Sequence, residues 1–137
     1  MRKTKGPVPL APAERERLEE CLAGIRSFLP IWLEFYLAFR RAYLGEPVTI
    51  EHEARFLQLK SDVARRHQYL YDHLGRDYVD GAYITDLLRS TVNLEKVAKT
   101  QSTNYYKIEN NWQRFYMNLQ DTVTSIQFRL EQEDRQT

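Results

Sequence analysis

The last two fifths of the chain, residues 82–137, contains neither glycine nor proline, so it lacks the two residues that most often interrupt a helix. Instead, larger and mostly apolar residues recur through it at alternating steps of three and four. This spacing is typical of a helix that packs against other helices in a bundle or coiled coil. The residues of this seam are Tyr83, Leu87, Thr91, Leu94, Ala98, Gln101, Tyr105, Ile108, Trp112, Phe115, Leu119, Thr122, Ile126 and Leu130.

The sequence also lacks an excess of either charge, since 20 basic residues balance 19 acidic ones. No basic field marks a nucleic-acid-binding surface, which argues against that class of partner. The single cysteine, Cys21, excludes an internal disulfide. No secretory signal is predicted, because the basic start is followed by Gly-Pro-Val-Pro-Leu-Ala-Pro and not by a continuous apolar run. No membrane span is predicted either, because the best candidate, Ser27–Leu44, contains Glu34, Arg40 and Arg41. We therefore expect a cytoplasmic protein.

Motifs typical of catalytic, cofactor-binding or metal-binding sites are scarce in the sequence. A glutamate three residues before a histidine is the pair that di-metal carboxylate bundles use, and none of the three histidines has one. A zinc site needs more cysteine and histidine than the chain contains. Glycine-rich phosphate loops, serine nucleophile motifs and cysteine–histidine signatures are missing as well. The sequence therefore predicts no enzyme, no cofactor and no metal site.

Helical periodicity organises the chain after a basic, proline-rich tail at residues 1–12. It predicts a helix over residues 13–44, bent at Pro30, because a proline inside a helix removes one backbone hydrogen bond. A break into two helices at that proline is the alternative. Further helices are expected over 49–74 and 82–133. Residues 13–134 would then form one all-α domain, an antiparallel bundle of three long helices.

The third of these helices has one weak point. Residues 100–104, Thr-Gln-Ser-Thr-Asn, are polar and poor helix formers. A turn near 101–104 would split the helix and give an ordinary bundle of four helices. The unbroken phase of the seam favours a continuous or merely bent helix. The four-helix alternative stays open at this point.

The helix over 13–44 is apolar over an unusually wide arc in its second half. One neighbouring helix cannot cover that arc, so this segment lies either at the centre of the bundle or at an interface. On the last helix, two tyrosines lie off the seam or at its edge and would suit a partner contact. The candidate interface residues are Ile31, Leu33, Phe35, Leu37, Tyr106 and Tyr116.

The helix over 49–74 carries an ionisable row, Glu53, Lys60 and His67, at seven-residue spacing. The row runs between two apolar rows. If it is buried, each group needs a partner, because an unpaired buried charge is costly. Neighbours in the row are about 10 Å apart along the helix, so their partners must come from other helices. The flanking rows are Ile50, Leu57, Ala64 and Tyr71 on one side and Phe56, Val63 and Leu70 on the other.

These patterns favour a non-catalytic adaptor or scaffold that acts in protein–protein interaction and self-associates, for example as a homodimer with coiled-coil contacts. A helical ligand-binding module is the alternative, with an aromatic pocket floored by Trp32, Tyr36 and Trp112 and anchored by His67 and Lys60. A third hypothesis, with less support, is attachment to a membrane surface through the basic tail and the first helix.

Overall fold

The structure is a computed structural model that describes residues 10–75, 78 and 82–135. Residues 1–9, which make up most of the predicted basic tail, lie outside the described residues. The part of the membrane-surface hypothesis that rests on this tail therefore concerns residues that the structure does not describe. The first helix begins at Pro12, a proline in the first turn, where its missing N–H costs nothing.

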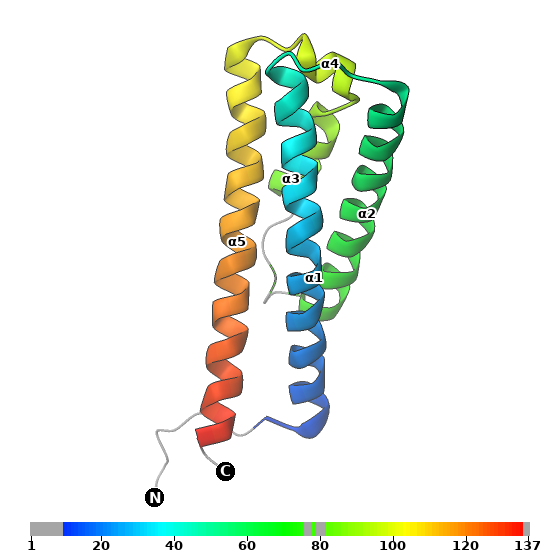
Figure 1. The fold of residues 1–137 in the computed structure, drawn as a ribbon. Coiled ribbons are helices and arrows are strands. Elements are labelled where there is room, and N and C mark those ends of the chain that lie inside the picture. Colours follow the sequence, from blue (N-terminus) through cyan, green and yellow to red (C-terminus); the bar gives the residue numbers. More distant parts are fainter. Residues whose placement is uncertain (1–9, 76–77, 79–81, 136–137) are drawn as a thin grey trace, which may run out of the picture.

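The described residues form helices and no strand, which confirms the all-α prediction. The first long helix runs upward in Figure 1 and the other two long helices run downward, and two short helices bring the chain back to the top between these two. The helices are α1 (Pro12–Tyr43), α2 (Ile50–Leu74), α3 (Ala82–Ser90), α4 (Leu94–Ala98) and α5 (Ser102–Arg135).

Helix α1 continues through Pro30, so the alternative of two separate helices is wrong. It ends at a turn in which Gly45 has a φ of 94°, a backbone conformation that glycine adopts without steric cost. By length and composition α1 could also cross a membrane, which the sequence reasoning did not allow. In this bundle it instead supplies nine buried residues.

Helix α2 begins at a capping box. The Thr49 hydroxyl accepts from the His52 backbone N–H at 3.1 Å, and the His52 ring accepts from the Thr49 N–H at 3.2 Å. Two backbone donors that the helix cannot satisfy are therefore paired locally. Gly75, with a φ of 54°, ends the helix.

The expectation of one helix over 82–133 is wrong. The chain leaves the helix after Ser90 and again after Ala98, so the predicted split near 101–104 is present and a second break precedes it. Polar side chains explain both breaks, since Thr91 and Thr100 bond back to carbonyls four residues earlier, each at 2.8 Å. Asn93 then caps α4 by accepting from the Lys96 N–H at 2.8 Å.

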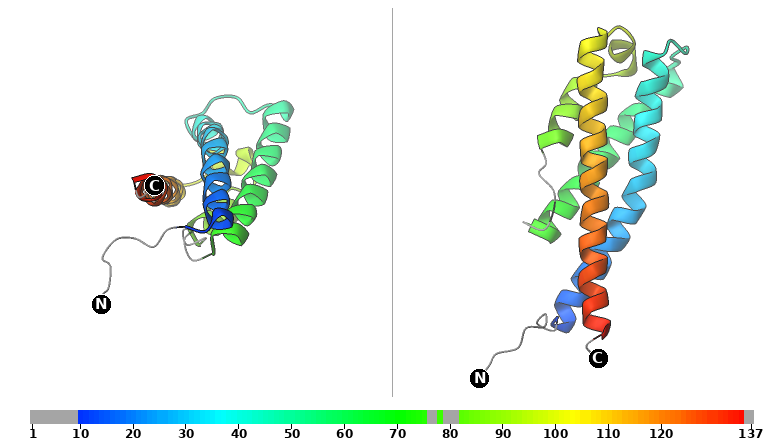
Figure 2. Two further views of the ribbon diagram at one scale, coloured as in Figure 1. Left: turned by 90° about the horizontal axis from the view of Figure 1, so that it is seen from below. Right: turned by 90° about the vertical axis from the view of Figure 1, so that its left-hand side faces the viewer.

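Helix α1 lies between α5 on one side and α2 on the other, and α3 packs against α5 behind them (Figures 1 and 2). Helix α4 closes one end of the bundle, where it contacts α1 and α2. Helices α2 and α5 therefore form opposite outer edges of the molecule.

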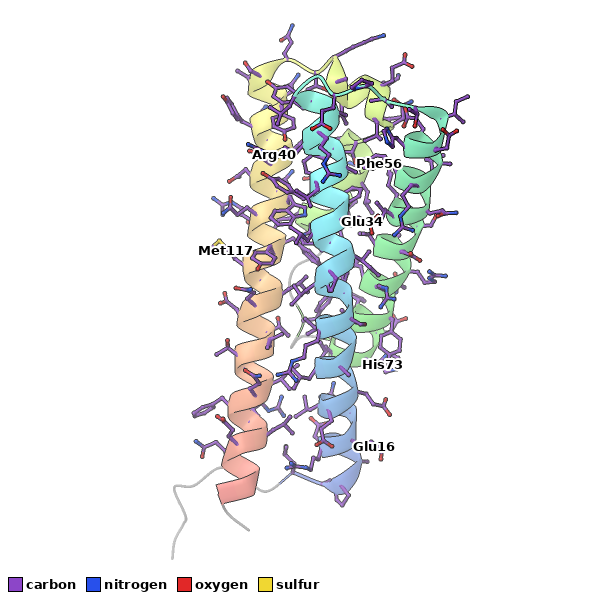
Figure 3. The ribbon with its side chains drawn as sticks, viewed as in Figure 1. Glu16, Glu34, Arg40, Phe56, His73 and Met117 are labelled. Carbon is purple, nitrogen blue, oxygen red and sulfur yellow. The ribbon has the colours of Figure 1, made fainter. Side chains whose placement is uncertain are left out.

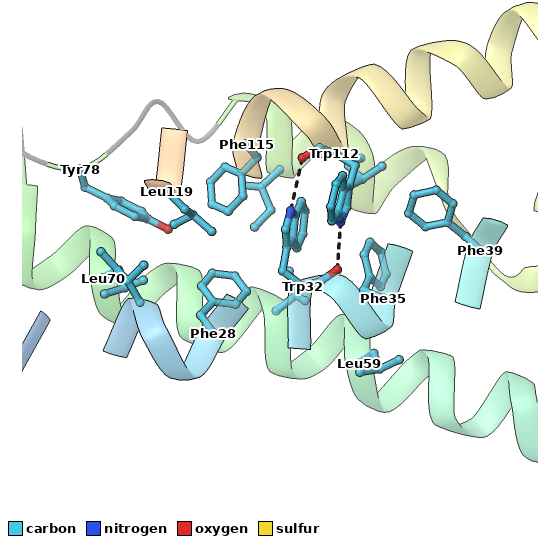
Figure 4. Close-up of a cluster of buried hydrophobic side chains, with 14 of the residues drawn as sticks. Phe28, Trp32, Phe35, Phe39, Leu59, Leu70, Tyr78, Trp112, Phe115 and Leu119 are labelled. Atoms are coloured by element: carbon cyan, nitrogen blue, oxygen red, sulfur yellow. Dashed lines mark hydrogen bonds between the residues drawn. The ribbon is translucent and has the colours of Figure 1, made fainter. Parts of the chain in front are cut away.

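An aromatic cluster fills the centre of the bundle (Figure 4). Trp32 of α1 and Trp112 of α5 stack with their rings 5.8 Å apart. Each indole N–H also donates to the backbone carbonyl of the other tryptophan, at 3.3 Å from Trp32 and 2.9 Å from Trp112. Phe115 completes the cluster with its ring 5.0 Å from Trp32. Buried indole groups need such partners, so this reciprocal pair fixes the register of α1 against α5.

Candidate functional site

The predicted ionisable row on α2 faces the segment that leads from α2 to α5. The Glu53 carboxylate accepts the backbone N–H of Leu94 at 2.8 Å and that of Glu95 at 3.0 Å. These donors belong to the first turn of α4, where the helix leaves its N–H groups unpaired and where a negative charge is favourable. Glu53 therefore acts as a cap supplied by another helix.

The other two groups of the row are paired in the same way. The Lys60 ammonium donates to the Thr91 carbonyl at 2.6 Å, just beyond the C-terminal end of α3. Nδ1 of His67 lies 3.0 Å from the Tyr78 hydroxyl. Burial lowers the pKa of Lys60 and that of His67, and it raises the pKa of Tyr78, because each charged form loses hydration.

The row thus joins α2 to the segment that follows it. Its members bind three separate points of that segment, at Tyr78, Thr91 and Leu94–Glu95. The prediction that the partners come from other helices holds for Glu53, whose partners lie in α4, whereas the partners of Lys60 and His67 lie between helices. No two members share a partner, so the row does not assemble an acid–base pair.

A second polar cluster, which the sequence reasoning missed, surrounds Glu109 of α5. One of its carboxylate oxygens accepts from Arg40 at 2.6 Å and from the hydroxyls of Tyr36 and Tyr105, both at 2.9 Å. Burial and the adjacent carboxylate raise the pKa of both tyrosines. Tyr43 stacks on Tyr105 at 3.6 Å. The cluster joins α1 to α5 near one end of the bundle.

The aromatic pocket expected from the sequence is filled. The ring of Tyr36 lies 4.4 Å from that of Trp112, and Trp112 stacks on Trp32. Trp32 is 0% exposed and Trp112 is 8% exposed. These three residues therefore pack on one another and leave no room for a ligand between them.

The grooves of the surface lie elsewhere. One of about 320 Å³ is bounded by α1, α2 and α4, and its lining includes His52, Glu34 and Arg55. Glu34 and Arg55 form a two-pronged ion pair, with both hydrogen bonds at 2.7 Å. Their charges are therefore already matched. A neighbouring groove of about 470 Å³ runs beside the start of α2. Neither is lined by the residues predicted to floor a ligand pocket.

The candidate interface divides into buried and exposed residues. Phe35 is 0% exposed and stacks on Phe56 of α2 at 5.1 Å, so its assignment to an interface is wrong: the wide arc of α1 is central in the bundle. Ile31 and Leu37 are partly buried, and Leu33 is 48% exposed. On α5, Tyr106 is 65% exposed, whereas Tyr116 is half-buried against Trp112.

Beyond Tyr106, the solvent face of α5 exposes two further large apolar residues, Met117 at 56% and Phe128 at 58%. Met117 points away from the bundle in Figure 3. They belong to a continuous line of exposed, uncharged positions at steps of three and four. We call this line the α5 outer stripe: Tyr106, Asn110, Gln113, Met117, Gln120, Thr124 and Phe128. The sequence reasoning missed it, although the eleven-residue spacing of its apolar members is visible in the sequence.

A similar line runs along α2. Ile50 is 83% exposed, and Leu57 and Tyr71 are each 55% exposed, so this apolar row faces solvent. Helix α1 covers the opposite side of α2, where Phe56, Leu59, Val63 and Leu70 are buried. The exposed line, called here the α2 outer stripe, consists of Ile50, Ala54, Leu57, Ser61, Ala64, Gln68 and Tyr71.

Metal-binding chemistry finds no support in the part of the chain that the structure describes, where no three His, Cys, Asp or Glu side chains gather. Cys21 is buried at 0% exposure. Burial raises the pKa of its thiol, and a thiol of that kind is less reactive than an exposed one. The burial of Cys21 and the raised pKa of its thiol reflect packing in the core and do not define a reactive site.

The architecture defines the chain as an all-α helical bundle. Comparison with known proteins adds no narrower class, since no family model, no curated protein and no solved structure matches the chain.

Proposed function

We propose that this protein is a non-catalytic helical bundle that acts in protein–protein interaction and self-associates through its outer helical faces. The observation that carries the proposal is the absence of charge from the outer stripes of α2 and α5. On both stripes, every position is solvent-exposed and none is charged.

The outer face of a surface helix in a globular protein is normally its charged face. In this chain 28% of the residues are charged, so there is no general shortage of charge. Both outer helices instead place charges at the flanks of their stripes and leave large apolar residues along the middle. Steps of three and four between uncharged residues are the pattern by which two helices pack in a coiled coil.

Small-angle X-ray scattering on an absolute scale, over a concentration series, tests the proposal because it gives mass and longest dimension together. We expect the mass to rise from that of one chain to that of a dimer or larger assembly as concentration increases. A compact monomer at every concentration would contradict self-association.

A further inference from the structure

We propose that the α5 outer stripe binds the same stripe of a second copy of this chain, with the two α5 helices antiparallel and Met117 at the two-fold axis. This inference rests on the proposed function, because it names the partner and the arrangement of the self-association.

The spacing of the apolar residues is symmetric about Met117. Eleven residues separate Tyr106 from Met117, and eleven separate Met117 from Phe128. An antiparallel pair centred on Met117 therefore brings Tyr106 of each copy opposite Phe128 of the other, twice by symmetry. Met117 meets its own counterpart at the centre. A two-fold interface requires this self-complementarity, because one patch must match itself.

The polar members of the stripe follow the same symmetry. In this register Gln113 lies near Gln120 of the partner, and Asn110 lies near Thr124 of the partner. These side chains carry donors and acceptors but no net charge, so they can pair across the interface without burying an unpaired ion. The stripe from Tyr106 to Phe128 is about 33 Å long, at about 1.5 Å per residue.

The charges beside the stripe select the antiparallel direction. Lys107, Arg114 and Asp121 follow one flank of α5 at seven-residue spacing, and all three are exposed. In an antiparallel pair the same flank of both helices comes together. The register centred on Met117 then places Arg114 of each copy beside Asp121 of the other, which forms two ion pairs. Arg114 also lies over the Tyr83 ring at 5.7 Å, which holds it on the α3 side of α5.

The α2 outer stripe fits a second copy of itself less well. Antiparallel pairing of Ile50 with Tyr71 and of Leu57 with Ala64 would bring Glu51 of each copy close to Asp72 of the other. Like charges in that position repel each other. This difference in charge favours α5 as the self-pairing helix.

Disulfide formation between single-cysteine variants tests the arrangement. A disulfide needs Cα atoms within about 7 Å, whereas two copies of position 106 would lie about 33 Å apart in the antiparallel pair. We expect Met117→Cys to cross-link with itself on mild oxidation and Tyr106→Cys not to do so. A mixture of Tyr106→Cys with Phe128→Cys should form the mixed dimer. Ser61→Cys, at the centre of the α2 outer stripe, reports pairing through α2, and the unmodified chain, with its buried Cys21, measures cross-linking by chance encounters.

Charge reversal provides a second test on the folded chain. Arg114→Glu and Asp121→Arg each turn both ion pairs into repulsive pairs and should weaken the dimer about three- to ten-fold in Kd, since exposed pairs of charges are individually weak. The double variant restores attraction and should recover most of the affinity. Recovery is not expected if either side chain acts only within its own copy.

The outcomes separate this inference from the proposed function. A chain that stays monomeric overturns both. A dimer in which Tyr106→Cys cross-links with itself is parallel, and one in which Ser61→Cys cross-links as fast as Met117→Cys uses another surface. Either result overturns the antiparallel α5 pairing and leaves self-association standing.

Discussion

The inner and outer faces of α5 share a spacing but differ in composition. On the inner face, Trp112, Phe115 and Leu119 are apolar and buried at 8% exposure or less. The outer stripe has the same three-and-four steps, yet it alternates large apolar residues with Asn, Gln and Thr. A permanent core excludes unpaired polar groups, whereas a surface that is free part of the time needs them for solubility. Under the proposed pairing, α5 carries two packing faces, one permanently buried and one that is free when the chain is monomeric.

The largest expected effect on stability comes from replacing a phenylalanine on the inner face of α5, and the same replacement on the outer stripe is the comparison. Phe115→Ala should reduce the free energy of unfolding by about 3–5 kcal/mol, because it opens a cavity beside Trp32. Phe128→Ala, a matched control at 58% exposure, should change it by less than about 1 kcal/mol. Urea denaturation at a concentration where the chain is monomeric measures both. Equal losses would contradict the assignment of the two faces.

A smaller loss of stability is expected from removing one of the contacts that join α2 to the segment between α2 and α5. Glu53→Ala leaves two N–H groups at the start of α4 without their acceptor and should cost about 1–2 kcal/mol. Glu51→Ala, on an exposed position in the same turn of α2, should have much less effect. Hydrogen exchange would locate the change, with faster exchange at Leu94 and Glu95. Unchanged exchange there would mean that Glu53 is not the cap.

The smallest effect is expected from pH. Burial lowers the pKa of His67 in the folded chain, so the unfolded chain binds a proton at higher pH than the folded one. The stability that comes from the neutral ring is therefore complete above the unfolded pKa, near 6.5, and declines as pH falls below it. The slope is at most about 1.4 kcal/mol per pH unit for one group.

Denaturation of the chain between pH 7.5 and 5 measures this slope, and the variant His67→Gln serves as the control. The variant should lose most of the decline over that range. The lowered pKa values of Glu14 and Glu34 act in the same direction but at lower pH, around and below their ordinary value of 4.5. A decline of equal size in His67→Gln would assign the effect to another group.

Much of the fold could be predicted from local patterns. Thr49 and Gly75 mark the ends of α2, and the inner seam predicts buried Tyr105, Trp112 and Phe115 correctly. These predictions succeed because caps and periodic apolar residues act within a few turns of the chain.

The breaks around α4 could not be predicted with the same ease. The seam keeps its phase through Thr91 and Gln101, although the chain leaves the helix close to both positions. At the start of α4, a contact distant in sequence adds to the local signals of Thr91 and Asn93, because Glu53 of α2 caps the first N–H groups of α4. Local helix preference is weak enough for such a tertiary contact to override it.

The surfaces were predicted in part. Tyr106 lies on the exposed face of α5, but Phe35 is buried and not at an interface, and the apolar row of Ile50, Leu57 and Tyr71 is exposed. The wheel of a single helix shows that a face is apolar and does not show which neighbours cover it. Helix α1 is surrounded by α2, α4 and α5, whereas α2 at the edge of the bundle has one side free.

The most direct measurement is the mass of the variant Met117→Glu beside that of the unmodified chain, by analytical ultracentrifugation at equal concentration. The substitution places two like charges together at the centre of the proposed pair and leaves the inner face untouched. We expect the unmodified chain to be dimeric and the variant to be monomeric, with the same unfolding free energy when both are compared as monomers. A dimer that survives the substitution would contradict the role of the α5 outer stripe.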